Sequence, residues 1–336
     1  MLPRGLLPLS GAALTSGEHA VPRRPGLEPR RWTLHGLNNG RIFKATCAGV
    51  RVLPRPVSYA LGHVGTWLAW RLTHHARRAV VDNLRALFPD DDERAVTRRA
   101  LDTYRAYARD IIDFLRAAAL PPGDAGDLFV ESETHRQLFA DLLAEGRGII
   151  LVTGHYGNWE IGSILIRDAL QLPLTVVAMT EANPEVNQAR RQIREALGVE
   201  TLEVRQTLET ALQLRRQLAA NRIIAMLVDR HLGRDRVPVR FLGRDASFLR
   251  TPALLAYMTG APIVPCFIER IGPGRFAAQP GTPIRVNREG ARDHAIQSAT
   301  QAIADALAAR VRQHPEYWYH FYRYWDAQQD AYDGLH

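Results

Sequence analysis

The chain has few groups that could cross-link it or hold a structural metal. Only two of its 336 residues are cysteine, Cys47 and Cys266, and they lie far apart, outside any CxxC pattern or histidine-rich cluster. This spacing argues against a disulfide framework and against a structural zinc site. A reducing, cytosolic setting is therefore the one we expect.

No apolar run is long enough to cross a bilayer. The most apolar stretch, Val57–Trp70, is uncharged but shorter than the roughly 20 residues that a membrane-spanning helix needs. The opening segment, Met1–Leu14, is interrupted by prolines and an arginine and lacks a clean cleavage site, so it is not typical of a signal peptide. We expect Val57–Trp70 to be interfacial or buried, with Trp67 and Trp70 as core or helix-packing residues rather than membrane anchors.

Lysine is almost missing: Lys44 is the only one, so nearly all of the +8 formal charge comes from arginine. From Met1 to Arg78 there are twelve Lys and Arg against Glu18 and Glu28, so this segment carries +10 and the remainder −2. The excess predicts a flexible basic leader over residues 1–41 and contact with an anionic membrane surface. Nucleic acid is not favoured as a partner, because no RNP, KH, zinc or basic-zipper pattern accompanies the charge.

A covalent nucleophile is also hard to find. The sequence has no GxSxG motif, and neither cysteine has a histidine near it in the sequence. A hydrolase that works through an acyl-enzyme is therefore disfavoured.

The rest of the chain shows two kinds of apolar pattern. Residues 42–120 repeat apolar positions at helical spacing, and Pro89 followed by an acidic cluster indicates a new helix start. Beyond that, residues 121–326 alternate short β-rich runs with helical segments, which is typical of a largely parallel sheet covered by helices. We predict an α/β domain over 121–326, an N-terminal helical, membrane-associating layer over 42–120 and a tail over 327–336.

The individual elements follow from the same patterns. The predicted strands are Gly148–Thr153, Leu174–Met179, Val199–Val204, Arg222–Val228, Pro262–Glu269 and Phe276–Val286. The predicted helices of the α/β domain are Gly157–Leu170, Pro184–Leu197, Thr207–Ala220, Thr251–Thr259 and His294–Gln313. The segment His314–Trp325 holds seven aromatics in twelve residues, and we expect it to cap the core, or alternatively to form a lipid-facing or acyl-facing wall.

The strongest chemical signal is the run GIILVTGHYGNWE, which ends in His155 and Glu160. A buried strand leads directly into the histidine, and open α/β sheets build their sites at the carboxyl ends of such strands. With Glu160 in the first turn of the next helix, its carboxylate could reach one ring nitrogen and leave the other free as a general base. Gly157 allows close backbone approach to a ligand, while Asn158 and Trp159 add a polar group and an apolar wall.

These residues resemble the signature block of the bacterial lipid A biosynthesis acyltransferases. Other blocks agree in order: Asn83-Leu84 with Phe88-Pro89, then Asn183-Pro184, Arg194 and Gly198, then Asp229 followed by Val239–Gly243. The resemblance covers roughly residues 50 to 325. It implies a glycerol-phosphate-acyltransferase-like fold and an acyl-carrier-protein or acyl-CoA thioester donor. It also implies a membrane lipid or glycolipid acceptor, no metal and no cofactor.

The resemblance also implies site residues and a location. His155 and Glu160 would be the catalytic pair, with His155 as base and Glu160 orienting it. Arg194, Asp229 and Arg230 would bind substrate or support the site, alongside Gly157, Asn158 and Trp159. The enzyme would lie at the cytoplasmic face of the inner membrane as a peripheral or interfacially anchored protein.

Two departures from the lipid A enzymes leave the acceptor open. Those enzymes commonly continue the aspartate with glutamine and the later block with two phenylalanines, whereas this chain has Asp229-Arg230 and Phe241-Leu242. The Asp-Arg pair is closer to the phosphatidylinositol mannoside acyltransferases of the same family. An acceptor other than lipid A, such as a phosphoinositide mannoside or a secondary metabolite, and a catalytically inactive lipid-binding relative are the alternatives.

Simpler interpretations of two residues also stay open. Arg194 could be a solvated charge near the end of a helix. Asp229 could form a buried ion pair with Arg230 or Arg250.

Overall fold

A computed structural model provides the structure of the protein. It describes residues 49–50, 52–120, 124, 128–130, 132–166, 172–178, 188, 191–192, 194–195, 199–203, 208–231 and 233–326. The predicted leader over 1–41, most of the predicted helix Pro184–Leu197 and the tail over 327–336 lie outside these residues, as do Asn183, Pro184 and Gly198. The predicted division into domains stays a prediction.

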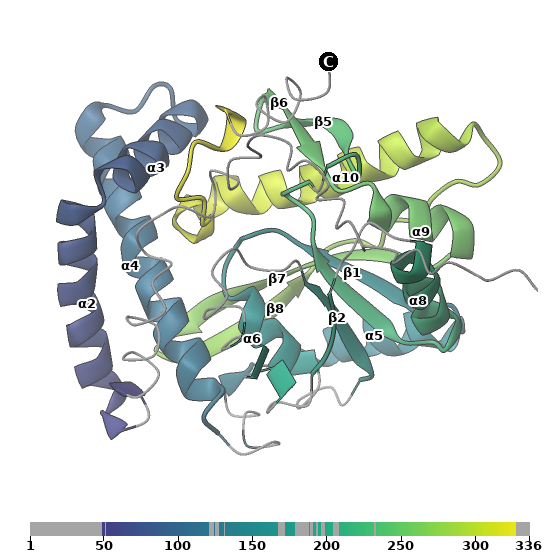
Figure 1. The fold of residues 1–336 in the computed structure, drawn as a ribbon, viewed down its shortest axis with the longest axis horizontal. Helices are drawn as coiled ribbons and strands as arrows, with labels where there is room; N and C mark the ends of the chain where they lie inside the picture. The colour runs from purple at the N-terminus through teal and green to yellow at the C-terminus, as the bar shows by residue number, and fades with distance from the viewer. Residues whose placement is uncertain are drawn as a thin grey trace, which may run out of the picture.

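A six-stranded sheet lies at the centre of the described part of the chain (Figure 1). Its strands are β1 (Ile149–Thr153), β2 (Leu174–Ala178), β3 (Glu200–Glu203), β4 (Ile223–Leu227), β7 (Ile263–Gly272) and β8 (Arg275–Pro280), in the spatial order β3-β2-β4-β1-β7-β8. All neighbours are parallel except β8, which runs antiparallel to β7. The predicted fold class, a mixed and largely parallel sheet covered by helices, is confirmed.

Both faces of the sheet are covered at its central strands, which explains why β1 and β4 are apolar along almost their whole length. Along β1, Ile150 and Val152 face one core cluster, and Ile149 and Leu151 face another. The first cluster includes residues of α8 (Leu208–Ala219), α9 (Thr251–Thr259) and α10 (Arg292–Gln313), and the second includes residues of α5 (Glu133–Ala144). Because side chains alternate along a strand, a strand with two buried faces becomes a continuous apolar run.

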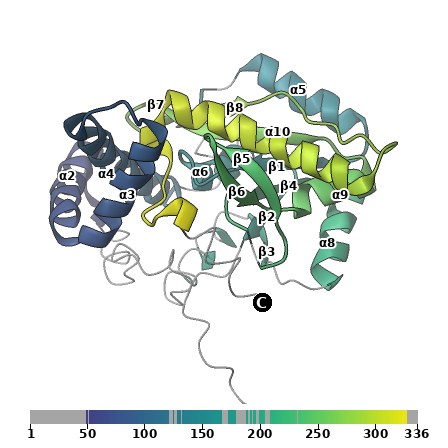
Figure 2. The ribbon, with the colours of Figure 1, turned by 90° about the horizontal axis from the view of Figure 1, so that it is seen from above.

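The N-terminal helices stand at one end of the sheet (Figures 1 and 2). They are α2 (Arg55–Leu72), α3 (His74–Leu87) and α4 (Glu93–Ala117). The predicted helix start after Pro89 is confirmed: Asp92 caps α4 and accepts a hydrogen bond from the Ala95 amide at 2.7 Å. Among the described residues, no helix is both long and apolar enough to cross a membrane.

A buried charged network ties this helical layer to the sheet. The guanidinium of Arg270, on β7, donates to Asp110 at 2.5 Å and also to Asp113, both on α4. The Tyr59 hydroxyl of α2 donates to Asp113 at 2.6 Å, and the Tyr319 hydroxyl donates to Asp110 at 2.7 Å. The two carboxylates are almost fully buried, and their contacts with the arginine replace the hydrogen bonds to water that they lose.

Helix α2 turns its apolar side outward. Its buried residues are Ser58 and Thr66, whereas Val57, Leu61, Val64, Trp67, Leu68 and Leu72 are exposed large hydrophobics. The expectation that Trp67 packs in the core is wrong, because 54% of it is exposed. Trp70 does pack, with its ring edge-on to Tyr104 at 5.4 Å between centroids. We call the six exposed side chains the α2 apolar face.

Several element boundaries differ from the sequence prediction. The hairpin of β5 (Val237–Phe241) and β6 (Arg244–Phe248) was not predicted, and neither was α5. The last strand ends at Pro280 rather than Val286, and α6 (Trp159–Ile164) begins two residues later than predicted. By contrast, α9 has the predicted bounds.

The turn between β1 and α6 generates a stability prediction. Gly157 has a φ of +59°, and a Cβ atom there would collide with the Ile268 carbonyl oxygen. Gly146 has a φ of +71° but nothing within 4 Å of such a Cβ. Gly146→Ala should therefore cost only the left-handed conformation, about 1–2 kcal/mol, and Gly157→Ala should cost clearly more. Thermal unfolding of the two variants side by side measures the difference, and equal losses in Tm would contradict the collision.

Candidate active site

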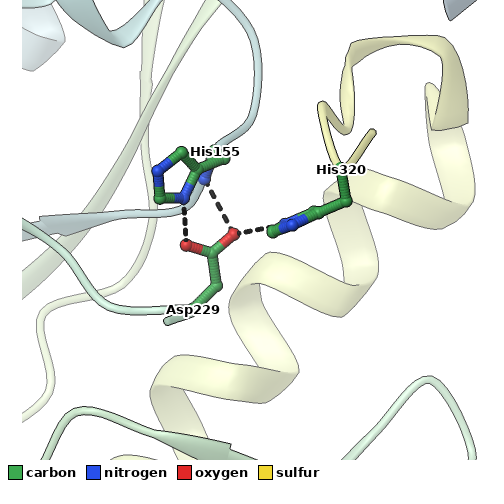
Figure 3. Close-up of side chains that lie close together, drawn as sticks. All are labelled: His155, Asp229 and His320. Atoms are coloured by element: carbon green, nitrogen blue, oxygen red, sulfur yellow. Dashed lines mark hydrogen bonds and ion pairs between the residues drawn. The ribbon is translucent and has the colours of Figure 1, made fainter. Parts of the chain in front are cut away.

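Two neighbouring parallel strands bring His155 and Asp229 together. Thr153, the last residue of β1, is opposite Leu227, the last residue of β4. His155 and Asp229 each lie two residues beyond the end of their strand. His155 Nδ1 is 2.7 Å from Asp229 Oδ1, and the His155 amide donates to Oδ2 at 2.8 Å (Figure 3). One carboxylate thus holds both the backbone and the ring of the same histidine.

Asp229 is completely buried, and its charge is stabilised by hydrogen-bond donors. Burial would raise the pKa of its carboxyl, but the electrostatic attraction of His155 and hydrogen bonds from His155 and His320 outweigh burial. The pKa of Asp229 therefore lies well below its usual range. Because an ionised carboxylate only accepts hydrogen bonds, Nδ1 of His155 carries a proton and donates it to Oδ1.

His320 approaches Asp229 from the other side (Figure 3). Its Nε2 lies 2.9 Å from Asp229 Oδ2, and its Nδ1 lies 2.9 Å from the Tyr322 hydroxyl. Burial lowers the pKa of His320 to about 3, despite the opposing effect of Asp229, so the ring is neutral. A neutral ring has one N–H; Nε2 donates it to the carboxylate, and Nδ1 accepts from Tyr322.

The three side chains have the chemistry of a metal site but the spacing of a hydrogen-bonded chain. His155, Asp229 and His320 offer ligand atoms that all lie within 4.8 Å of one another. Ligand atoms around a tetrahedral zinc with bonds near 2.0 Å are separated by about 3.3 Å. The donor–acceptor distances of 2.7 and 2.9 Å are those of direct hydrogen bonds, which already occupy these atoms.

Glu160 is bound to Arg194. The arginine donates from Nη2 to Oε1 at 2.9 Å and from Nε to Oε2 at 3.3 Å, and both side chains are largely buried. Arg194 is therefore not the solvated helix charge that was one interpretation of the sequence. The sequence predicts Glu160 as the carboxylate that orients His155, whereas the carboxylate at Nδ1 is that of Asp229.

Gly157 and Asn158 build the turn after His155. The Gly157 amide donates to the Tyr317 carbonyl at 2.9 Å, so this N–H is already used within the protein. Asn158 caps α6 through Oδ1, and its Nδ2 donates to the Asp110 carbonyl at 2.9 Å. These contacts give both residues a structural use, and their predicted role in substrate binding stays a prediction.

Trp159 and Arg230 flank the histidines. The Trp159 ring lies edge-on to His155, with 5.3 Å between centroids. Its predicted role as an apolar wall for a ligand stays a prediction. Arg230 lies over the Tyr322 ring at 5.2 Å. The ion pair considered for Asp229 is not the observed arrangement, because its described side-chain partners are histidines and Arg250 pairs with Asp293.

The aromatic segment contributes residues that the sequence did not single out. His314–Trp325 lies largely within the core, as predicted, but it also brings His320 to Asp229. The Tyr324 hydroxyl donates to the Asp229 carbonyl at 3.0 Å, and the Tyr319 amide donates to the His155 carbonyl at 2.8 Å. Only the density of aromatic residues marked this segment, and that signal indicates burial rather than chemistry.

Comparison with known proteins identifies the family. The model of the family described as bacterial lipid A biosynthesis acyltransferase matches residues 37–327. A phosphatidylinositol mannoside acyltransferase of Mycolicibacterium smegmatis is 31% identical over 247 residues, which cover 71% of this chain and 74% of that protein. One of Mycobacterium tuberculosis is 30% identical over 189 residues, covering 54% of this chain and 56% of that protein.

The match spans all of the described residues, including the strand–turn–helix segment with His155 and the aromatic segment with His320. The chain therefore belongs to the bacterial lipid A biosynthesis acyltransferase family, and it is an enzyme that transfers acyl groups.

Proposed function

We propose that the enzyme moves a fatty acyl group from an acyl-carrier-protein or acyl-CoA thioester to a hydroxyl of a membrane lipid or glycolipid. The observation that carries this proposal is the buried pair of His155 and Asp229 at the carboxyl end of the sheet. An imidazole whose Nδ1–H is held by a carboxylate presents Nε2 as a general base.

In this mechanism the acceptor hydroxyl attacks the thioester carbonyl carbon while Nε2 of His155 takes the hydroxyl proton. The tetrahedral intermediate collapses, the new ester bond remains, and the carbon–sulfur bond breaks. The imidazolium returns its proton to the leaving thiolate, so the base is regenerated. Asp229 stabilises the imidazolium without taking the proton itself. A thiolate leaves readily, so the enzyme needs no nucleophile of its own.

Glu160 receives a different role in this proposal from the one that the sequence suggested. Its bidentate contact with Arg194 fixes the guanidinium, and we assign Arg194 to the donor or acceptor, with Arg230, Gly157 and Trp159 as further binding residues. An oriented arginine is also a candidate for stabilising the negative oxygen of the intermediate, because the Gly157 amide is already engaged.

We further propose a phosphoinositide mannoside or a related glycolipid as acceptor. Two observations support this choice over lipid A. The relatives compared above are named phosphatidylinositol mannoside acyltransferases, and the chain has Asp229-Arg230 at the block where the sequence departs from lipid A enzymes. Incubation of a labelled acyl donor with each candidate acceptor, followed by product identification, tests the assignment.

The location forms part of the proposal. The enzyme would lie at the cytoplasmic face of the inner membrane as a peripheral protein, with the α2 apolar face in the interface. An exposed row of leucines, valines and a tryptophan on one helix is typical of interfacial insertion.

The catalytic pair is tested by comparing its two candidate carboxylates. His155→Ala should lower kcat by about 10²–10⁴-fold, since a positioned base contributes about this much. Asp229→Asn should have a similar effect because it disturbs the Nδ1–H contact. Glu160→Gln should act mainly on KM, since it loosens Arg194. Steady-state kinetics of the folded variants decide, and a larger kcat defect in Glu160→Gln than in Asp229→Asn would return the orienting role to Glu160.

The pH dependence tests His320 as a positioning residue. The ionised Asp229 has a pKa too low to limit activity near neutral pH, so the acidic limb of kcat/KM reports protonation of His155. Without the His320 N–H, more of the negative charge of Asp229 is available to stabilise the His155 imidazolium. The pKa of His155 therefore rises. His320→Leu should therefore shift the acidic limb to higher pH and lower kcat by about 10–100-fold, whereas His320→Gln, which can still donate, should do less. If the pH profiles of both variants superimpose on that of the wild type, His320 is only a packing residue.

The membrane contact predicts a loss of lipid binding when α2 becomes polar. Leu61→Ser with Leu68→Ser should weaken binding to neutral vesicles at least about tenfold, because each inserted leucine contributes about 1.5–3 kcal/mol. Leu212→Ser, at an exposed leucine on α8, is the control and should leave binding unchanged. Vesicle sedimentation measures both. If the double variant sediments as well as the wild type, α2 does not insert.

A further inference from the structure

A cavity of about 700 Å³ lies between α2 and α4, apart from the catalytic pair. Its lining includes Trp67 and Trp70 of α2 and four arginines, but none of His155, Asp229, Glu160 or Arg194. The acyl-transfer mechanism leaves this cavity without a role, although it combines positive charge with aromatic walls.

Three of the four arginines are neutralised by carboxylates. Arg270 binds the buried Asp110 and Asp113, Arg99 binds Asp91 at 2.8 Å, and Arg105 binds Asp102 at 3.0 Å. Both side chains of the Arg105–Asp102 pair are exposed, so this interaction is weak and another anion can readily replace Asp102.

Arg109 is the exception. Its partner among the described residues is His63, whose Nε2 lies 3.2 Å from the Arg109 Nη2. Burial, followed by the charges of Arg109 and Arg105, lowers the pKa of His63, so its ring is neutral and accepts the arginine's N–H. A neutral imidazole orients a guanidinium without cancelling its charge. The lining also holds two carboxylates, Asp102 and Glu316. Among the described residues neither of them pairs with Arg109, which is therefore an oriented cation without a carboxylate partner, next to Arg105, whose partner Asp102 is exposed.

The position of the cavity indicates the source of its anion. Trp67 belongs both to its lining and to the α2 apolar face. Tryptophan prefers the headgroup level of a bilayer, so an α2 helix that lies in the interface brings the cavity to the depth of the lipid phosphates. Guanidinium groups bind phosphate oxygens by paired, charge-assisted hydrogen bonds.

We propose that this cavity binds the phosphate of an anionic phospholipid headgroup, with Arg109 as the principal contact and Arg105 as the second. The inference rests on the membrane association proposed above and adds a defined lipid site to it. Such a site would hold the enzyme on anionic membranes independently of the acceptor at His155.

The test compares two arginines of the same helix in the full-length protein. Arg109→Gln and Arg98→Gln remove the same charge from α4, but Arg98 is exposed and does not line the cavity. Binding is measured with vesicles of phosphatidylcholine alone and with added phosphatidylglycerol. Arg109→Gln should weaken binding to the anionic vesicles by about tenfold, as expected for a lost charge-assisted hydrogen bond, and should leave binding to neutral vesicles unchanged. Arg98→Gln should change binding by less than about twofold.

A second variant and a donor assay complete the test. Arg109→Lys keeps the charge but not the paired donors, so it should retain part of the anionic preference, and thermal unfolding confirms that each variant is folded. Equal losses for Arg109→Gln and Arg98→Gln would mean general electrostatic attraction and overturn the site. A raised KM for acyl-CoA with unchanged vesicle binding would assign the cavity to the donor's phosphates and overturn it too. Failure of the wild type to bind any vesicle would instead refute membrane association itself.

Discussion

The buried Asp229 carboxylate is the interaction on which the rest of the site depends. A charge without exposure to water is tolerated only when donors surround it, and here His155 and His320 supply them. Each donor comes from a different part of the fold: one follows β1, and the other lies in the aromatic C-terminal segment. The two carboxylate oxygens of Asp229 therefore connect the turn after β1, the C-terminal segment and the proposed general base.

A second set of buried charges connects the helical layer to this centre. Asp110 of α4 accepts hydrogen bonds from Arg270 of β7 and from Tyr319, whose amide in turn donates to the His155 carbonyl. The membrane-associating helices proposed above are thus joined to the turn that holds the histidine. The side chains in these contacts are buried or partly buried. A shift of α4 against the sheet would therefore move the turn that carries His155.

The sequence predicted what depends on neighbouring residues and missed what depends on topology. Buried strands such as β1 and β4 are readable because both of their faces are apolar, and His155 follows one of them directly. The partner of His155 could not be read, because β4 lies beside β1 only through a strand order that does not follow the chain. Glu160 was the nearest carboxylate in sequence, while Asp229 is the nearest in space. The β5–β6 hairpin escaped prediction since Pro238 lies inside it, and proline argues against a strand.

His155 and Asp229 lie equally far along the chain from the ends of their strands. This spacing limits insertions and deletions in the two connections that follow β1 and β4. Each residue follows the last residue of its strand by two positions, and those last residues are paired in register. An added residue in one connection would rotate or displace one partner while the other stayed in place. The two connections therefore act as matched spacers. A length change in one is tolerable only with a compensating change in the other, whereas surface loops farther from the pair are free of this constraint.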